Sequence, residues 1–278
     1  MAHKYTREEM LELDPMLLRM HLRERIHHTV EHQLYLIIYG DRKPHKKLGD
    51  GVREIIDVWE ERGLPQGLPD IKWVYQLMNL LDRVQQGEKI EEVEGAFFPE
   101  RFSDSELKTV DKLIKTRRSF RQWSDKPVPT EMVEEIIEAG MWAPTGCNFE
   151  ILRFIIMDTK EELERFHNLE FGLEQVKIVA CIDRRPYDEA DFPPPAKNAI
   201  LDVGGTMQTM ALKAHALGLG GCWSTFSDQQ IEDIKEHYNL PDYIQVVTYL
   251  SLGWPTEKVL PPLRMDFREA ILNKWPVQ

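Results

Sequence analysis

The sequence predicts an α+β fold, with a sheet covered by helices on both faces and a helical extension before it. Three apolar runs have the length and composition of buried strands, and segments with helical periodicity separate them. No convincing strand pattern occurs before about residue 152. Because helices and strands are intermixed only in the later part of the chain, that part is expected to carry the sheet. The predicted strands are LRFIIMD at 152–158, VKIVACID at 176–183 and QVVTYLSLG at 245–253.

The first hundred residues are predicted to be helical. Pro15 can open a helix that runs from about Met16 to Ile38, after which the glycine- and proline-containing stretch GDRKPHKKLGDG breaks the pattern. A second helix is expected over about 52–61. A third is expected to follow Asp70, a natural N-cap residue.

The character of the chain changes near Phe102. Ser103 and Glu106 form a capping box at the start of a new amphipathic helix. We therefore divide the chain into a helical N-terminal extension, residues 1–102, and a second domain, residues 103–278. The later helices are marked by apolar faces and by caps, namely the face at Val133, Ile136, Ile137 and Met141, the capping box of Thr159 and Glu162, the long helix from Lys197 to Leu217, and the start at Ser227 and Gln230.

Gly204 and Gly205 lie in the middle of the long predicted helix, where each glycine costs about 0.5–1 kcal/mol relative to alanine. Two explanations stay open. A neighbouring element of the same chain packs closely there, or the backbone of a partner subunit approaches.

Composition and charge narrow the class of protein. The 278 residues carry a formal net charge of −12, which disfavours binding to nucleic-acid phosphates. The three cysteines form no CxxC pair, which indicates a reducing compartment. No apolar run approaches the roughly 20 residues of a membrane span, and the start MAHKYTREEM shows no secretory signal. We expect a cytoplasmic protein that binds neither nucleic acid nor membrane.

Four short motifs carry candidate binding groups. Arginine forms paired, charge-assisted hydrogen bonds with phosphate, and a serine hydroxyl adds another. Turns rich in proline and glycine can aim backbone N–H groups at a flat heterocycle, and glycines let a ligand come close to the backbone. Each motif alone is also compatible with a solvated basic turn or a plain connecting loop. The motifs are RRSFR at 117–121, APTGCN at 143–148, GLGGCWST at 218–225 and PPLR at 261–264.

The order and spacing of these motifs resemble the FMN-dependent nitroreductase family. Members typically show an RRSxRxF-like start, then PVP, an AP(S/T)xxN turn before a strand, a helix ending in GLG, a GxP segment and a phosphate-binding arginine. This chain has RRSFRQW, KPVP, APTGCN, HALGLGGCW, GWP and PPLR in that order. The resemblance covers about residue 103 to the C-terminus. It implies a nitroreductase-like, mostly antiparallel sheet flanked by helices, and a homodimer with FMN at the interface.

The resemblance also assigns cofactor-binding residues. Arg117, Ser119 and Arg264 would hold the FMN phosphate, with help from Arg118. Arg121 would lie near N1 and O2 of the flavin ring, where a positive charge stabilises the reduced form. The remaining residues would line the ring. Pro144, Thr145 and Gly146 would do so directly, Asn148 would reach its rim from the partner subunit, and Trp223, Ser224 and Thr225 would pass N5. A hydroxyl at N5 would favour one-electron chemistry.

The implied activity is that of an FMN-dependent oxidoreductase. NADH or NADPH would reduce the flavin, and a small organic substrate such as a nitroaromatic or quinone would then enter the same pocket, in a ping-pong mechanism. No catalytic protein nucleophile is needed, and Cys147 and Cys222 are expected to be structural. Two alternatives stay open. One is a specialised member such as a reductive dehalogenase-like enzyme, because the family includes iodotyrosine deiodinases and a flavin-destroying benzimidazole synthase. The other is a non-catalytic flavin-binding protein.

The chain departs from the family pattern in places. Members often have Gln-Pro-Trp after the asparagine of the turn, whereas this chain has Glu150-Ile151-Leu152, and the helical extension has no counterpart in the minimal fold. A proline-rich lid is predicted from Asp183 to Pro195. Its residues Arg184, Arg185 and Tyr187 are candidates for substrate contacts.

One competing motif points to different chemistry. HTVEH at residues 28–32 spells HxxEH, which places His28 and His32 on one helix face as in some zinc proteases. No third ligand is evident beyond the acidic run at 91–94, so we interpret the segment as a solvated helix face and predict no metal site.

Overall fold

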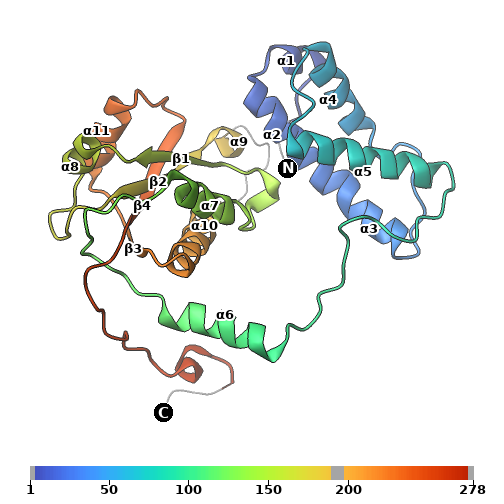
Figure 1. The fold of residues 1–278 in the computed structure, drawn as a ribbon. Helices are drawn as coiled ribbons and strands as arrows, with labels where there is room; N and C mark the ends of the chain where they lie inside the picture. Colours follow the sequence, from blue (N-terminus) through green and yellow to red (C-terminus); the bar gives the residue numbers. More distant parts are fainter. Residues whose placement is uncertain (1–3, 189–196, 275–278) are drawn as a thin grey trace.

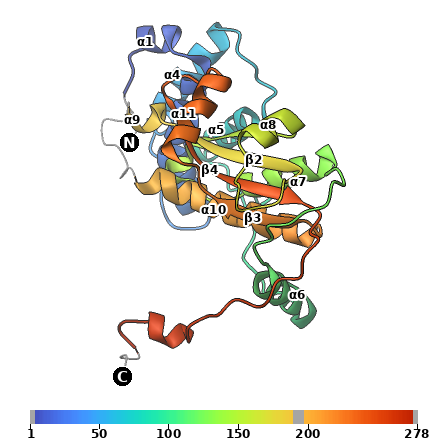
Figure 2. The same ribbon diagram turned by 90° about the vertical axis from the view of Figure 1, so that its left-hand side faces the viewer.

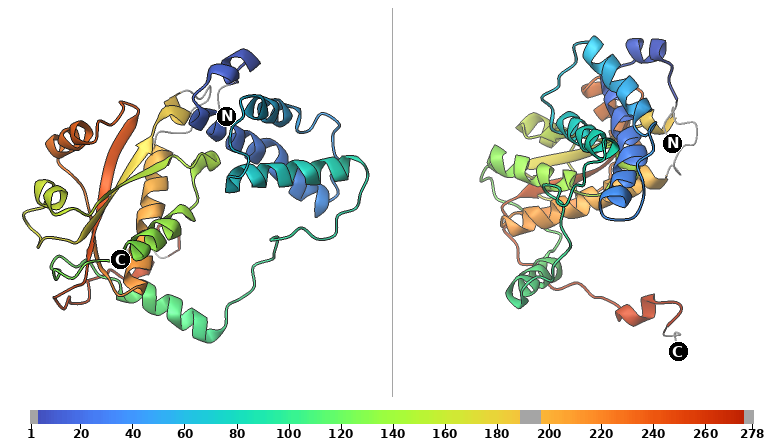
Figure 3. Two further views of the ribbon diagram at one scale, coloured as in Figure 1. Left: turned by 45° about the horizontal axis from the view of Figure 1, so that its top comes forward. Right: turned by 90° about the vertical axis from the view of Figure 1, so that its right-hand side faces the viewer.

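The computed structural model describes residues 4–188 and 197–274. Its first part is a bundle of helices that lies beside the sheet (Figures 1 and 3). The bundle has an apolar core of its own, to which Leu22, Val58 and Leu81 contribute. An extended segment then leads to α6 (Asp104–Thr116). The elements of the bundle are α1 (Arg7–Glu12), α2 (Pro15–Arg25), the π-helix η1 (Ile26–Glu31), α3 (His32–Ile38), α4 (Asp50–Glu61) and α5 (Pro69–Gln85).

Helix α2 begins as the sequence predicts. Asp14 is its N-cap and accepts hydrogen bonds from the backbone N–H groups of Met16 and Leu17 at 2.9 and 3.2 Å, with Pro15 at the first position. The path to Ile38 is helical throughout, although η1 widens it to π geometry. The N-cap prediction for Asp70 is wrong, because α5 begins at Pro69 and Leu68 occupies the cap position. The Asp70 carboxylate is instead taken by two arginines of α2.

The second part of the chain is built on a four-stranded antiparallel sheet in the order β1-β2-β4-β3. All residues of the central strand β2 are buried, and they alternate between two cores. Ile178 and Ile182 pack with α7 and α10, whereas Val179 packs with α8 and α11. The α+β fold predicted from the sequence is thereby confirmed. The elements are β1 (Leu152–Met157), β2 (Val176–Asp183), β3 (Gly220–Ser224), β4 (Ile244–Gly253), α7 (Thr130–Met141), α8 (Lys160–Arg165), α9 (Arg185–Asp188), α10 (Lys197–Ala216) and α11 (Asp228–His237).

Strand β3 was missed by the sequence prediction, which treated its glycines as a loop for a ligand. Glycine is rare in strands because it packs poorly there. Here the glycine is needed for packing, since a Cβ at Gly220 would lie 2.9 Å from Cβ of Phe120 and 3.0 Å from Cβ of Pro255. Gly218, with φ of +83°, ends α10 as predicted.

Two parts of the structure leave apolar side chains exposed. Helix α6 has no buried residue, and Val110 and Ile114 are exposed on it. The segment after residue 256 runs away from the sheet and carries the short 3-10 helix η3 (Phe267–Ala270) (Figures 1 and 2). Among residues 4–188 and 197–274, none of the helices combines the length and the apolar character that crossing a membrane requires.

Candidate functional site

The arginine motif lies directly beside the glycine-rich strand. The backbone N–H of Phe120 donates to the carbonyl of Gly221 at 3.1 Å, and Ser119 forms a parallel bridge with Gly221. The indole N–H of Trp123 donates to the carbonyl of Gly220 at 2.8 Å. Two motifs about one hundred residues apart in sequence therefore lie side by side at one edge of the sheet, which we call the arginine edge. Ser119 pairs with Gly221 at the start of β3, and Trp223, Ser224 and Thr225 follow along the same strand and its end.

The GWP segment completes this edge. Pro255 forms an antiparallel bridge with Trp123, and a Cβ at Gly253 would come within 2.8 Å of the Trp123 ring. Gly220 of the GLGGCWST motif and Gly253 of the GWP segment thus allow close packing within the chain. The expectation that the glycines of the GLGG stretch serve mainly to admit a ligand is not supported at Gly220.

Arginine side chains place positive charge at this edge. Burial lowers the pKa of His215 at the end of α10, and the nearby Arg117 and Arg118 lower it further. Burial raises the pKa of the Cys222 thiol, but Arg121 and Arg117 oppose the increase. A concentrated positive potential in a chain of net charge −12 suits an anionic group, because guanidinium groups form charge-assisted hydrogen bonds with phosphate.

The exposed side chains of β3 offer a surface next to the arginines. Trp223 is 43% exposed, and its indole N–H donates to the Thr248 hydroxyl at 2.7 Å, which fixes the ring on the sheet. Ser224 is half-buried and Thr225 is exposed. These residues can therefore contact a ligand bound at the edge.

The APTGCN motif, residues 143–148, forms a strained turn away from the arginine edge. The backbone N–H of Gly146 donates to both carboxylate oxygens of Asp202 on α10, at 3.1 Å each, so this N–H is already used within the chain. Cys147 and Asn148 have φ of 55° and 54°, and Glu150 has φ of 49°. Left-handed backbone at residues other than glycine costs free energy and is concentrated at functional sites. The Asp202 carboxylate was not singled out from the sequence, although an acidic residue on the buried face of an apolar helix was a visible signal.

The turn and the arginine edge lie at opposite ends of α10. The turn contacts Asp202 near the start of this helix, and the arginines surround His215 at its end. Thirteen residues separate these positions, which corresponds to about 20 Å along a helix axis at 1.5 Å per residue. Within one chain, Pro144, Thr145, Gly146 and Asn148 are therefore not brought together with the arginine motif.

Arg264 is also separate from the other predicted phosphate ligands in this chain. It lies in the exposed C-terminal segment, where its guanidinium donates to the carbonyl of Leu263 at 3.0 Å.

The candidate substrate residues of the lid have structural partners. Arg185 pairs with Asp183 at 2.7 Å and with Asp14 at 3.2 Å, and Tyr187 is buried beside Phe149. Arg184 donates to the carbonyl of Asp242 at 3.1 Å. Residues 189–196 of the predicted lid lie outside the described residues.

The histidine motif shows no metal-binding arrangement in the part of the chain that the structure describes. No group of three or more His, Cys, Asp or Glu residues there is arranged to hold a metal ion. His27, His28 and His32 instead pack ring against ring, with centroids 4.7 Å apart for His27 and His32.

The cysteines offer no activated thiol. Cys181 and Cys222 are buried and Cys147 is partly buried. Burial raises the pKa of all three thiols, that of Cys181 to about 12. A thiolate nucleophile is therefore disfavoured at neutral pH.

The fold defines a class of protein, an α+β protein with an antiparallel sheet between helices on both faces. Comparison with known proteins identifies the family. The family model "Nitroreductase family" matches residues 114–190 and 172–254, so the chain belongs to the nitroreductase family. The matched ranges exclude the helical bundle.

Several similar proteins match this chain over most of their own length. A Methanothermobacter thermautotrophicus protein assigned as an NADH dehydrogenase/NAD(P)H nitroreductase is 28% identical over 181 residues, 62% of this chain and 92% of its own. An FMN reductase [NAD(P)H] of Bacillus subtilis is 26% identical over 60% of this chain and 76% of its own. A solved Desulfovibrio desulfuricans protein, assigned as a nitroreductase and in complex with FMN, is 26% identical with a TM-score of 0.52, over 59% of this chain and 96% of its own.

Proposed function

We propose that this chain binds FMN between two copies of itself and transfers electrons from NADH or NADPH to a small organic oxidant. As a member of the nitroreductase family, it is assigned to the FMN-dependent NAD(P)H oxidoreductases. The observation that carries the proposal is the arginine edge, where Arg117 and Ser119 lie against β3 in an otherwise acidic protein.

The residues of the edge fit the phosphate and the ring of FMN. Arg117 and Ser119, with Arg118, would hold the phosphate through charge-assisted hydrogen bonds. Arg121 would place positive charge at the pyrimidine side of the ring, and Trp223 with Thr225 would line the adjacent surface. Bound FMN would supply the hydride acceptor and the electron store of the reaction. The protein would orient donor and oxidant in turn in one pocket, as a ping-pong scheme requires.

A homodimer would join the separated motifs. In an antiparallel pair of α10 helices, the Asp202 end of one helix lies near the His215 end of the other. The turn 144–148 of one subunit would then reach the arginine edge of its partner. The open surface at Gly204 supports this arrangement, because a Cβ there would meet nothing within 4 Å in the same chain. The alternative explanation, close packing within the chain, therefore does not hold for Gly204, whereas a Cβ at Gly205 would lie in ordinary contact with Cβ of Ala143 at 3.7 Å.

The exposed apolar side chains support the same dimer. On α10, Ile200 and Leu201 are 49% and 66% exposed beside Gly204. Apolar surface that a single chain leaves uncovered marks interaction surfaces. A partner subunit would cover the outer faces of α6 and α10, and the C-terminal segment would wrap around it, bringing Arg264 toward a phosphate. That segment carries Leu260, Leu263, Met265, Phe267 and Leu272, all more than half exposed.

The proposal also covers the division of the chain. Residues 1–102 would form an addition outside the family pattern, joined to an FMN-binding domain at 103–278. The family match, which begins at residue 114, supports this division.

The deciding experiment is an absorption spectrum of the purified protein, followed by anaerobic titration with NADPH and then by nitroaromatics, quinones and halophenols. We expect a yellow protein that NADPH bleaches and that an oxidant from this panel restores. A colourless protein that takes up no added FMN would refute the proposal. Yellow colour that persists in excess NADPH and NADH would favour a non-catalytic flavin-binding protein, and preferential turnover of halophenols would favour a dehalogenase-like enzyme.

A further inference from the structure

Helix α2 belongs to two cores at once. Leu18 and Leu22 are buried in the core of the helical bundle, whereas Leu17 and Met20 pack in the core that α7 and α10 share with the sheet. The bundle is therefore fastened to the second domain by buried side chains as well as by the chain connection.

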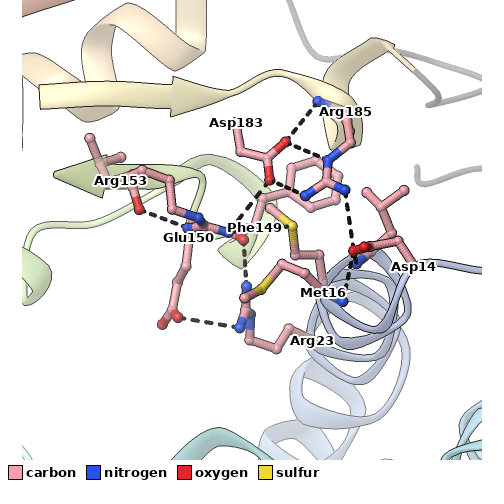
Figure 4. Close-up of polar contacts among 11 residues, drawn as sticks. Asp14, Met16, Arg23, Phe149, Glu150, Arg153, Asp183 and Arg185 are labelled. Atoms are coloured by element: carbon pink, nitrogen blue, oxygen red, sulfur yellow. Dashed lines mark hydrogen bonds and ion pairs between the residues drawn. The ribbon is translucent and has the colours of Figure 1, made fainter. Parts of the chain in front are cut away.

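We call this contact between the helical bundle and the second domain the seam. Arg23 of α2 lies at its polar centre (Figure 4). Its side chain is 3% exposed. Nη2 donates to the carbonyl oxygen of Phe149 at 2.8 Å, Nη1 donates to Asp70 of α5 at 2.8 Å, and the Glu150 carboxylate lies 3.6 Å from Nη1. Since a guanidinium stays protonated, it is a permanent donor to the Phe149 carbonyl.

Asp70 holds Arg23 in place. Arg19, one turn earlier on α2, forms a bidentate pair with the same carboxylate at 2.6 and 2.7 Å. Burial alone would raise the pKa of Asp70, but hydrogen bonds from Arg19 and Arg23 outweigh this effect and lower it. The carboxylate is therefore ionised at neutral pH and compensates the buried charge of Arg23.

The carbonyl that Arg23 binds belongs to the strained turn. Three residues within four positions, Cys147, Asn148 and Glu150, have left-handed backbone. Such a turn persists only where neighbouring groups hold it. Asp202 fixes its first end through the N–H of Gly146, and Arg23 fixes its second end through the carbonyl of Phe149.

The departure from the family pattern coincides with this contact. Ile151 follows Glu150 directly, and a proline in its place would push Glu150 toward an extended backbone. With isoleucine at that position, Glu150 can adopt its φ of 49° and lie near Arg23. The altered residues and the helical bundle thus meet at one point.

We propose that Arg23 is a positioning residue for the flavin-lining turn 144–148, so that the helical bundle is a working part of the cofactor site. The proposal rests on the proposed function, because only there does the turn contact FMN. Arg23 and Asn148 also line one cavity of about 700 Å³ at the seam, together with Trp73, Glu138 and Met141. The bundle therefore borders the same space as the turn.

The test compares Arg23→Met with Arg19→Met in the full-length protein. Both variants lose a partner of Asp70, but only Arg23 contacts the turn. We expect Arg23→Met to weaken FMN binding by about tenfold or more, the loss of one charge-assisted hydrogen bond, and to lower kcat more than it changes KM for NADPH. Arg19→Met should keep FMN affinity within about twofold of wild type. Arg23→Lys retains one donor and should recover part of the affinity and kcat.

A second readout does not depend on flavin. Hydrogen exchange of the backbone N–H groups of Asn148 and Phe149, which donate to Thr145 and Gly146 at 3.2 Å, should accelerate in Arg23→Met and not in Arg19→Met. Equal FMN affinity and equal exchange in both variants would overturn the inference, as would equal losses in both, which would indicate a purely structural role. If Arg23→Met does not fold, Arg23→Lys is compared with Arg19→Met instead, and we expect a smaller loss of FMN affinity and faster exchange in Arg23→Lys alone. Equal FMN affinity and equal exchange in these two variants would then overturn the inference. Failure of wild type to bind FMN would refute the proposed function, while the exchange data would still test the positioning of the turn.

Discussion

The seam between the helical bundle and the sheet differs in chemistry from the surface formed by α6, α10 and the C-terminal segment. At the seam, charged side chains such as Arg23 and Asp183 are nearly inaccessible and have partners of opposite charge. On the other surface, apolar side chains such as Leu201 are exposed. A single chain pairs these charges of the first surface by itself and leaves the second surface open. The difference supports the proposal that α10 meets a second chain, whereas the bundle docks within its own chain.

The largest expected effect concerns the exposed apolar surface of α10. Leu201→Asp places a charge in the proposed dimer interface, which a desolvated interface does not tolerate without a partner. We expect sedimentation velocity to show a monomer that has lost bound FMN, because each site would then lack the partner's turn. The matched control is Leu169→Asp, since Leu169 is 92% exposed and lies on the loop after α8. A dimer that persists in Leu201→Asp would contradict the proposed arrangement.

The next effect tests the closed seam. Arg185→Met removes the guanidinium that pairs with Asp183, a carboxylate that is 1% exposed. It leaves this carboxylate the backbone N–H of residue 185 at 3.2 Å and the more distant Arg153 at 3.7 Å. An uncompensated buried charge costs about 3 kcal/mol of unfolding free energy, which denaturant titration would measure. Arg184→Met is the control, because Arg184 is 43% exposed, donates to the carbonyl of Asp242 and lies 3.9 Å from the half-exposed Asp188 carboxylate of α9. Equal stabilities of the two variants would show that the seam is not held by these charges.

A smaller effect concerns pH. The arginines lower the pKa of Asp70 below its ordinary value of 3.8, despite the opposing effect of burial. A lowered folded-state pKa gives stability that is present above the unfolded pKa and is lost as pH falls through the folded pKa. Asp70→Asn should therefore cost about 2 kcal/mol at pH 7, and the difference from wild type should shrink as pH falls below 3.8. A difference that stays constant over this range would exclude the ion pair as its cause.

The sequence predicted the parts of this comparison that depend on local pattern. Apolar runs marked β1, β2 and β4, and the capping boxes at Ser103 and Ser227 are present in the structure. Of the predicted arginine motif, Ser119 does pair with Gly221 of β3. The rest required three-dimensional contacts. Strand β3 was not recognised, because Gly220 is required for packing against Phe120, a contact that the sequence does not show. Asp70 is not the N-cap of α5, and its carboxylate instead pairs with Arg19 and Arg23 of another helix.

The site itself was predictable only in part for the same reason. Arg23 lies on the buried face of α2, in a segment outside the family pattern, and nothing in its local sequence relates it to a turn 126 residues away. The assignment of Arg264 and of the turn 144–148 to the FMN site stays a prediction, since a second chain would be needed to bring these residues to the arginine edge.

The smallest expected effect sharpens the comparison through two glycines. In the isolated chain, a Cβ at Gly204 of α10 or at Gly51 of α4 would meet nothing within 4 Å. Alanine should then stabilise either helix by up to about 1 kcal/mol, since it restricts the unfolded chain and favours the helix. We expect this gain for Gly51→Ala, whose helix belongs to the bundle. For Gly204→Ala we expect the opposite sign, because the added methyl group would separate two crossing backbones. Thermal unfolding and the dimer dissociation constant, measured over a range of protein concentration, would separate the two. A Gly204→Ala variant that gains stability like Gly51→Ala, with unchanged dissociation, would place the partner elsewhere.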